Sequence, residues 1–283
     1  MHGQERQASE RISAASGGSS RLGMLVLLCL AQLMVILDIS AVNVALPDLA
    51  KDVGLGRGEL SWTITSYSLL FGSLLLLGGR AADLIGRRRV FLTGLGVFTL
   101  ASLSSALAGS AATLFAARAG QGLGAAMLSP AALSIITATF SEGRERTRAL
   151  GVWGAVGGAG AAVGVLLGGL LTQLIDWRAI FLINLPVGLI VAAGVSRVVP
   201  VDRRRPRWRA LDIPGALLAT ASLAALVFAL SRAQSAGWIS AQTLGVGAAG
   251  LAGLVVFAAY EQRAATPLLN IARLRDRAVG GGS

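Results

Sequence analysis

Residues 61–109, SWTITSYSLLFGSLLLLGGRAADLIGRRRVFLTGLGVFTLASLSSALAG, decide the fold of this 283-residue chain. Two apolar runs, 61–79 and 90–109, flank a short gap at 79–89 that holds four arginines. Each run has about 20 residues, which at about 1.5 Å per residue is enough to cross a hydrocarbon core of roughly 30 Å. The segment is typical of two membrane-spanning helices joined by a basic loop.

The same pattern repeats along the chain and predicts an all-α integral membrane protein with eight spans. Every second gap is rich in arginine, and these gaps, with both terminal segments, hold 20 of the 25 basic residues. Because Lys and Arg collect in cytoplasmic loops, the alternation predicts a multi-pass protein of the cell membrane with both termini in the cytoplasm. The predicted spans are 22–46, 61–79, 90–109, 113–137, 149–174, 179–199, 211–231 and 239–260.

The composition excludes several other classes of protein. Hydrophobic residues make up 54% of the chain and charged residues 14%, which rules out an ordinary soluble domain. The arginines behind the net charge of +11 alternate along the chain, so they fit loops beside anionic lipid and no nucleic-acid-binding patch. Cys29 and His2 are the only residues of their types. We therefore expect no disulfide, no metal site, no His-based catalytic triad, no cofactor and no enzyme activity.

The spacing of the spans divides the chain into a six-helix unit followed by two further helices. The largest basic gap separates the two, and the first residues are polar and rich in Ser and Gly, which is typical of a disordered tail. The predicted units are a disordered cytoplasmic tail (1–21), a six-helix bundle (22–200), a basic cytoplasmic linker (201–210), two linking transmembrane helices (211–260) and a cytoplasmic C-terminal stretch (261–283).

Two charged residues, Asp38 and Arg118, lie well inside predicted spans. A charge in the bilayer interior is by default a functional-site hypothesis. By helical rise, Asp38 lies about 12 Å and Arg118 about 8 Å from the non-cytoplasmic ends of their spans, so both can face one cavity. Burial favours the neutral form of a carboxyl group, whereas a nearby guanidinium favours the charged form. A substrate in the cavity can shift this balance, so the pair could couple substrate movement to the uptake or release of a proton. In the alternative interpretation, Arg118 extends to the membrane surface and Asp38 pairs with an amide such as Asn43.

Glycines give a second signal in the span at 149–174. Gly160, Gly164 and Gly168 follow one another at intervals of four residues, which places them on one face of a helix. Such a stripe lets a neighbouring helix approach backbone to backbone, so it predicts a close helix–helix contact.

The gap at 79–89 is more than a basic loop, because Asp83 stands in it between two glycines. A carboxylate in a short turn can hold the following arginines or the N-terminus of a helix.

Together these segments resemble the major facilitator superfamily, specifically its fourteen-helix drug:proton antiporter branch. LDISAVNVALP at 37–47 is similar to the first-helix motif of that branch, with Ser40 where Thr is usual. Residues 79–89 resemble the loop signature G-x-L-A-D-R-x-G-R-R, although Ala and Leu replace its Leu and internal Arg. LFAARAGQGLGAA at 114–126 matches the fourth-helix pattern throughout, and DWRAIFLINLPVG at 176–188 is similar to the entry into helix 6.

The resemblance implies roles for particular residues. Arg118 is the expected proton-coupling arginine, and the other cavity residues are Asp38, Asn43 and Gln121. The gating loop is expected to consist of Gly79, Asp83, Gly86, Arg87 and Arg88, and the antiporter motif of helix 5 of Gly160, Gly164, Gly168 and Gly169. Val165 stands where that motif has a proline, so the kink that a proline would introduce is missing.

The resemblance also implies an activity, namely proton-coupled export of small amphipathic or drug-like molecules. Proteins of the branch have six helices, two linking helices and six more, and the eight spans here match the first eight. Because transport rocks one half against the other, another chain would have to supply the second half. The alternative is a truncated, non-transporting membrane fragment or packing partner. Expected partners are the lipid bilayer, a small-molecule substrate, protons and a chain supplying the second half, without nucleic acid.

Overall fold

A computed structural model describes residues 2–56, 59–202 and 213–262, and the regular elements in these residues are all helices. Eight segments are long and apolar enough to cross a membrane, because α6 and α7 together form one of them. The predicted all-α fold with eight spans is confirmed, whereas most of the predicted linker and C-terminal stretch lies outside the described residues. The helices are α1 (His2–Val53), α2 (Leu60–Ile85), α3 (Arg87–Ala106), α4 (Ala111–Thr139), α5 (Arg144–Leu174), α6 (Arg178–Leu182), α7 (Asn184–Val198), α8 (Ile213–Ala236) and α9 (Ala241–Glu261).

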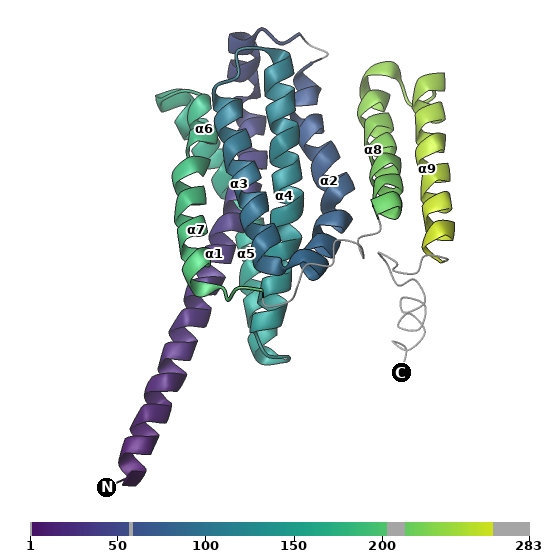
Figure 1. The fold of residues 1–283 in the computed structure, drawn as a ribbon. Coiled ribbons are helices and arrows are strands. Elements are labelled where there is room, and N and C mark those ends of the chain that lie inside the picture. Colours follow the sequence, from purple (N-terminus) through teal and green to yellow (C-terminus); the bar gives the residue numbers. More distant parts are fainter. Residues whose placement is uncertain (1, 57–58, 203–212, 263–283) are drawn as a thin grey trace.

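Helices α1 to α7 form one bundle in which α4 packs against both α2 and α3, while α1 packs along α5 and α7 (Figure 1). Small residues let the α4 backbone approach its neighbours closely. A Cβ added at Gly124 would lie 2.5 Å from the backbone nitrogen of Phe98 on α3, and one added at Gly78 on α2 would collide with the carbonyl of Ala126. Close approach of this kind is how membrane helices associate without a hydrophobic driving force.

One end of the bundle is fastened by a contact between α1 and α6. Arg178 forms an ion pair with Asp52 at 2.8 Å, and the indole nitrogen of Trp177 donates a hydrogen bond to the same carboxylate at 3.2 Å. At the same end of the bundle, Leu49, Trp177 and Phe181 are buried together in one apolar cluster. The contact therefore joins the C-terminal end of the long first helix to the helix that leads into α7.

Helices α8 and α9 form a hairpin that lies beside α2 (Figure 1). The rings of Trp62 on α2 and Phe228 on α8 have centroids 5.8 Å apart, and Thr220 donates a hydrogen bond to the carbonyl of Ser73 at 3.2 Å. The hairpin thus packs against α2, on the outside of the bundle and away from the polar interior described below.

The structure differs from the sequence prediction at both ends of the first span. Helix α1 begins at His2, where the sequence predicts a disordered tail over residues 1–21, and it continues through Pro47 to Val53. The residues before Ser20 include Glu, Gln, Arg and Ala, which have good helix propensity, and no proline interrupts them. The membrane-length part of α1 starts at Ser20, and Figure 1 shows the preceding turns projecting beyond the bundle.

The sixth span, predicted as one segment at 179–199, is interrupted between α6 and α7 at Ile183. Pro186 explains the interruption, because it has no N–H to donate to residue 182 and its ring collides with that carbonyl. In the first turn of a new helix the missing N–H is not needed, so α7 starts at Asn184. Asn184, the first residue of α7, is buried within the bundle.

Candidate functional site

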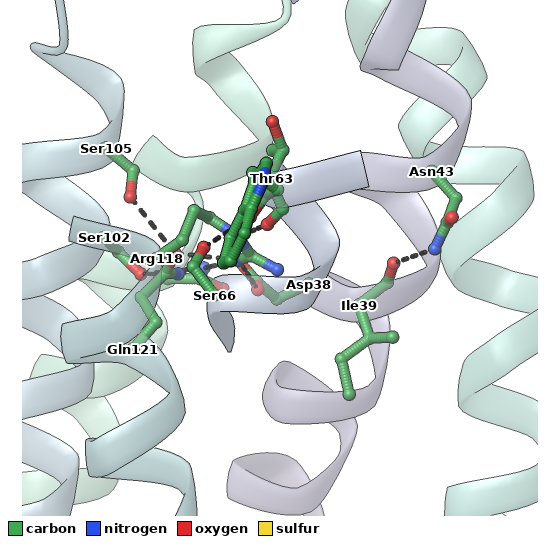
Figure 2. A network of polar contacts seen from close by, with 11 residues as sticks. Asp38, Ile39, Asn43, Thr63, Ser66, Ser102, Ser105, Arg118 and Gln121 are labelled. Atoms are coloured by element: carbon green, nitrogen blue, oxygen red, sulfur yellow. Dashed lines mark hydrogen bonds and ion pairs between the residues drawn. The ribbon is translucent and has the colours of Figure 1, made fainter. Parts of the chain in front are cut away.

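Asp38 on α1 and Arg118 on α4 meet inside the bundle (Figure 2). Nη1 of Arg118 lies 2.5 Å from Oδ2 of Asp38, and the two side chains are 2% and 0% exposed. The alternative interpretation, in which Arg118 extends to the membrane surface, is therefore wrong. Removing both charges from solvent is costly unless their remaining hydrogen-bonding groups are also satisfied.

Gln121 on α4 forms several of the hydrogen bonds that the buried pair needs. It lies three residues after Arg118, so both side chains emerge from the same face of the helix. Its amide nitrogen donates to Asp38 Oδ1 and to Ser102 Oγ, each at 2.8 Å. Its carbonyl oxygen accepts from Arg118 at 2.8 Å and from Ser105 at 3.1 Å. Gln121 therefore makes contact with both members of the ion pair and fixes them relative to α3.

Helix α2 holds the guanidinium of Arg118 from another side. Nε of Arg118 donates to the backbone carbonyl of Thr63 at 3.2 Å, and its Cζ lies 4.6 Å from the centroid of the Tyr67 ring. The ring of Phe181 on α6 lies 5.8 Å away. Aromatic faces stabilise a cation through their quadrupole, so the arginine is paired with a carboxylate and enclosed by rings at the same time.

The sequence prediction missed Asn184, Ser102, Thr63 and Tyr67 as members of this network. The amide nitrogen of Asn184 donates to Asp38 Oδ1 at 3.2 Å and to Ser102 Oγ at 3.1 Å, and both residues are at least 99% buried. For Asn184 and Ser102 the signal was present in the sequence, because each is a polar residue inside an apolar span, whereas Thr63 takes part through its backbone carbonyl and Tyr67 through its ring. A search restricted to charged residues in the spans overlooks such neutral groups.

Asn43, which was predicted to belong to the cavity, does not join the network. Its side chain is exposed, and its amide donates to the carbonyl of Ile39 one turn earlier on α1 at 2.7 Å (Figure 2). The predicted alternative pairing of Asp38 with Asn43 is therefore wrong as well. Asn43 lies five residues after Asp38, which is more than one helical turn and points its side chain away from Arg118.

The predicted gating loop is a sharp connection between two helices. Gly79 and Asp83 lie in the last turns of α2, Gly86 separates the helices with a φ of 123°, and Arg87 and Arg88 begin α3. Only glycine adopts such a φ without strain. The connection therefore turns within a single residue.

The carboxylate at the N-terminus of α3 comes from Asp202, not from Asp83. Asp83 is exposed and makes no ion pair among the residues that the structure describes. Asp202, which follows α7, accepts a hydrogen bond from the backbone nitrogen of Arg88 at 3.2 Å. Asp83, Gly86 and Asp202 line a cavity of about 340 Å³. The sequence could not indicate this partner, since it lies 114 positions after Arg88.

The predicted glycine stripe of α5 lies against α1. Cβ atoms added at Gly164 and Gly168 would lie 2.7 Å from Ser40 Cβ and 2.6 Å from Ala41 Cα, and one at Gly160 would lie 3.1 Å from a Leu33 methyl group. Gly169, by contrast, has only a Val44 methyl group at 3.8 Å. Val165, at the position of the motif proline, is 50% exposed and α5 continues through it unbroken.

The chain resembles proteins of known function over most of its length. It is 45% identical to the cephamycin export protein CmcT of Amycolatopsis lactamdurans over 93% of this chain and 54% of that protein. It is 48% identical to the puromycin resistance protein of Streptomyces alboniger over 91% of this chain and 51% of that protein. The methylenomycin A resistance protein of Bacillus subtilis is 37% identical to this chain, over 90% of this chain and 54% of that protein. The chain thus spans about half the length of these curated relatives.

A solved structure supports the fold independently. The bacterial homologue of the human lysosomal transporter Spinster, in an inward-facing and occupied conformation, superposes with a TM-score of 0.55 at 18% identity. The match covers 77% of this chain and 55% of that protein. The model of the Major Facilitator Superfamily matches residues 28–269. The relatives bear out the predicted drug-efflux branch, and the family consists of transporters and not of enzymes. The chain is a multi-pass membrane protein that belongs to the Major Facilitator Superfamily.

Proposed function

We propose that this chain forms the proton-coupling half of an exporter of small amphipathic molecules in the cell membrane. The observation that carries the proposal is the buried pair of Asp38 and Arg118 with its two amides. An ion pair is not needed to stabilise a membrane helix bundle, since apolar packing serves as well. Ionisable groups in the membrane interior are instead typical of proton relays.

The proton cycle follows from the hydrogen-bonding capacity of the carboxyl group. As a carboxylate, Asp38 only accepts hydrogen bonds, and it accepts them from Arg118, Gln121 and Asn184. As a carboxylic acid it must donate one, so its attraction for the guanidinium falls and Arg118 can reorient. A substrate entering beside the pair would change the same balance, which couples its movement to uptake or release of one proton.

The orientation in this proposal places both termini in the cytoplasm. The arginines of the α2–α3 connection and those at the start of α5 then lie on the cytoplasmic side, as the distribution of positive charge requires. The contact of Asp52 with Arg178 lies at the opposite, external side. The hairpin of α8 and α9 would occupy the position of the two linking helices.

The proposed substrates are antibiotic-like molecules, in accordance with the names of the relatives that export cephamycin or confer resistance to puromycin and methylenomycin A. A second six-helix half, supplied by another polypeptide, would complete the cavity, because alternating access rocks one half against the other. Without it, the chain would be a membrane fragment that packs but does not transport.

Flux measurements test the proposal. The chain is reconstituted in liposomes alone and together with the second half of the puromycin resistance protein, and efflux of a fluorescent dye is followed after a pH jump. We expect proton-driven efflux only with both halves, its loss in Asp38→Asn, and its retention in the matched control Asn43→Ala. Absence of efflux in both preparations, with both halves folded and associated, would support the non-transporting alternative.

A further inference from the structure

We propose that Asn184 is a positioning residue that couples the protonation of Asp38 to the α2–α3 connection through α7. The inference rests on the proposed proton-coupled function and extends it from the buried pair to the cytoplasmic end of the bundle. Asn184 begins α7, is 1% exposed, and reaches both α1 and α3 through Asp38 and Ser102. A carboxamide buried in a membrane helix bundle is costly unless it is hydrogen-bonded, so its place is specific to this contact.

Asn184 can serve both protonation states of Asp38. Its amide nitrogen has two hydrogens, which are donated to the carboxylate at 3.2 Å and to Ser102 at 3.1 Å. When Asp38 is a carboxylic acid, its O–H needs an acceptor, and rotation of the same amide presents the carbonyl oxygen in place of the nitrogen. The group that stabilises the charged state thereby also stabilises the neutral state.

Gln121 is less able to make this change, although it also donates to Asp38. Its side chain makes four hydrogen bonds, to Asp38, Ser102, Ser105 and Arg118, and rotating its amide would break all of them. Rotation of the Asn184 amide breaks two. The smaller number of bonds identifies Asn184 as the group that responds to the proton.

The other groups that face Asp38 come from four neighbouring helices. Arg118 on α4 is the charged partner, and Tyr67 on α2 is the titratable group beside it. Helix α3 contributes the neutral Ser102, and α5 presents Gly164 to α1 near this level. Protonation of Asp38 therefore changes the charge balance of one carboxyl–guanidinium pair.

Helix α7 provides the route from this pair to the α2–α3 connection. It is continuous from Asn184 to Val198, and Ser196 lies about 18 Å further along the helix axis than Asn184. A Cβ at Gly194 would lie 2.6 Å from methyl groups of Leu27, so α7 is in close contact with α1. A continuous helix in close contact moves as a rigid element, and a shift at its first residue reaches its last turn.

At the far end, α7 and the residues that follow it hold Arg88. The carbonyl of Ser196 accepts from Nη2 of Arg88 at 2.7 Å, and Asp202 accepts from the Arg88 backbone nitrogen at 3.2 Å. These bonds fasten the beginning of α3 when Asp38 is a carboxylate. Protonation would break the bonds that tie Asn184 to Asp38 and Ser102 and so release the start of α7, and the resulting shift of α7 would loosen the contacts with Arg88 and expose the connection.

The test measures exposure of the connection as a function of pH. A cysteine is placed at the exposed Arg89 (Arg89→Cys) after removal of the single native thiol (Cys29→Ser), and the full chain is inserted in nanodiscs. The labelling rate with a membrane-impermeant maleimide is divided by that of free cysteine at each pH. We expect faster relative labelling at low pH, and no pH dependence in Asp38→Asn.

Three variants decide the role of Asn184. Asn184→Leu, of similar size, should reduce the pH-dependent change in labelling at least about fivefold, the factor that corresponds to typical coupling between sites. Asn184→Gln should restore part of it, and Asn43→Ala, an asparagine outside the network, should leave it unchanged. The inference would be overturned if Asn184→Leu kept the full pH response, or if the labelled protein with Cys29→Ser and Arg89→Cys alone showed no pH response.

A further variant at the other end of the route tests the inference even if Asn184→Leu does not fold. Asp202→Ala alters only the partly exposed far end of the route, and it should likewise reduce the response; an unaltered response would overturn the inference. Because labelling needs no transport, loss of dye efflux with a preserved labelling response would refute the proposed export and leave the coupling of Asn184 to the connection standing.

Discussion

Helices α4 and α5 have similar compositions and different surroundings. Both are rich in Gly and Ala, yet 56% of the most apolar window of α4 is buried and only 17% of that of α5. Glycines of α4 contact the backbones of α2 and α3, whereas α5 contacts α1 along one stripe and has nothing within 4 Å of the Cβ position at Gly154 or Gly158. The comparison teaches that small residues permit close packing, while the buried polar residues of α4 mark it as the central helix.

The largest effect should come from the charged residue that distinguishes α4. Arg118→Ala would leave the Asp38 carboxylate buried without its partner, which costs about 3–5 kcal/mol of stability. Thermal unfolding of the purified protein in detergent measures the loss. The double variant Asp38→Asn with Arg118→Gln removes both charges and should recover part of the stability. A single variant as stable as the parent would mean that Asp38 is neutral in the folded protein.

A smaller loss is expected where α4 passes α2. Gly122→Val adds side-chain atoms directly against the backbone carbonyl of Tyr67, which cannot move away without displacing α2. Overpacking of this kind costs about 1–3 kcal/mol. The same substitution at Gly158 on α5 is the matched control and should be tolerated, since its Cβ position is open. Equal melting temperatures for the two variants would contradict the difference between the helices.

The packed stripe of α5 should be less sensitive. Gly164→Ala places a methyl group 2.7 Å from Cβ of Ser40, so α1 and α5 must separate slightly, at a cost of about 1 kcal/mol. Ser40→Gly removes the nearest opposing atom, while the backbone of Leu37 stays 3.0 Å away, so the double variant should recover part of the melting temperature. If the double variant were no more stable than Gly164→Ala alone, the contact between these two helices would be looser than described.

The smallest effect is expected on the open face of α5. Gly154→Ala meets no atom within 4 Å and should change the stability by less than about 0.5 kcal/mol. The same unfolding assay applies, repeated after addition of a second six-helix half. A substantial loss in the isolated chain would show that this face is already covered there, and a loss only in the presence of the second half would place that half against α5.

The sequence predicts the parts of this structure that depend on local chemistry. Apolar run length and arginine alternation are sufficient for the eight spans, and the cost of a buried charge is sufficient to select Asp38 and Arg118. Contacts between distant segments are different, because no local preference encodes them. Asn184 reaches Asp38 across 146 positions, and Asp202 takes the place expected for Asp83 only because α7 ends beside α3. Asn43 was misplaced because neighbours in sequence face different sides of a helix.

The ion pair of Asp52 and Arg178 should respond to salt differently from the buried pair of Asp38 and Arg118. Its side chains are 47% and 37% exposed, so dissolved ions screen their attraction over about 8 Å at physiological ionic strength. The pair of Asp38 and Arg118 is shielded from those ions by the surrounding helices. Raising the salt concentration should therefore weaken this exposed pair, and likewise the exposed pair of Arg21 and Glu145 between α1 and α5 at the other end, while the central pair stays intact.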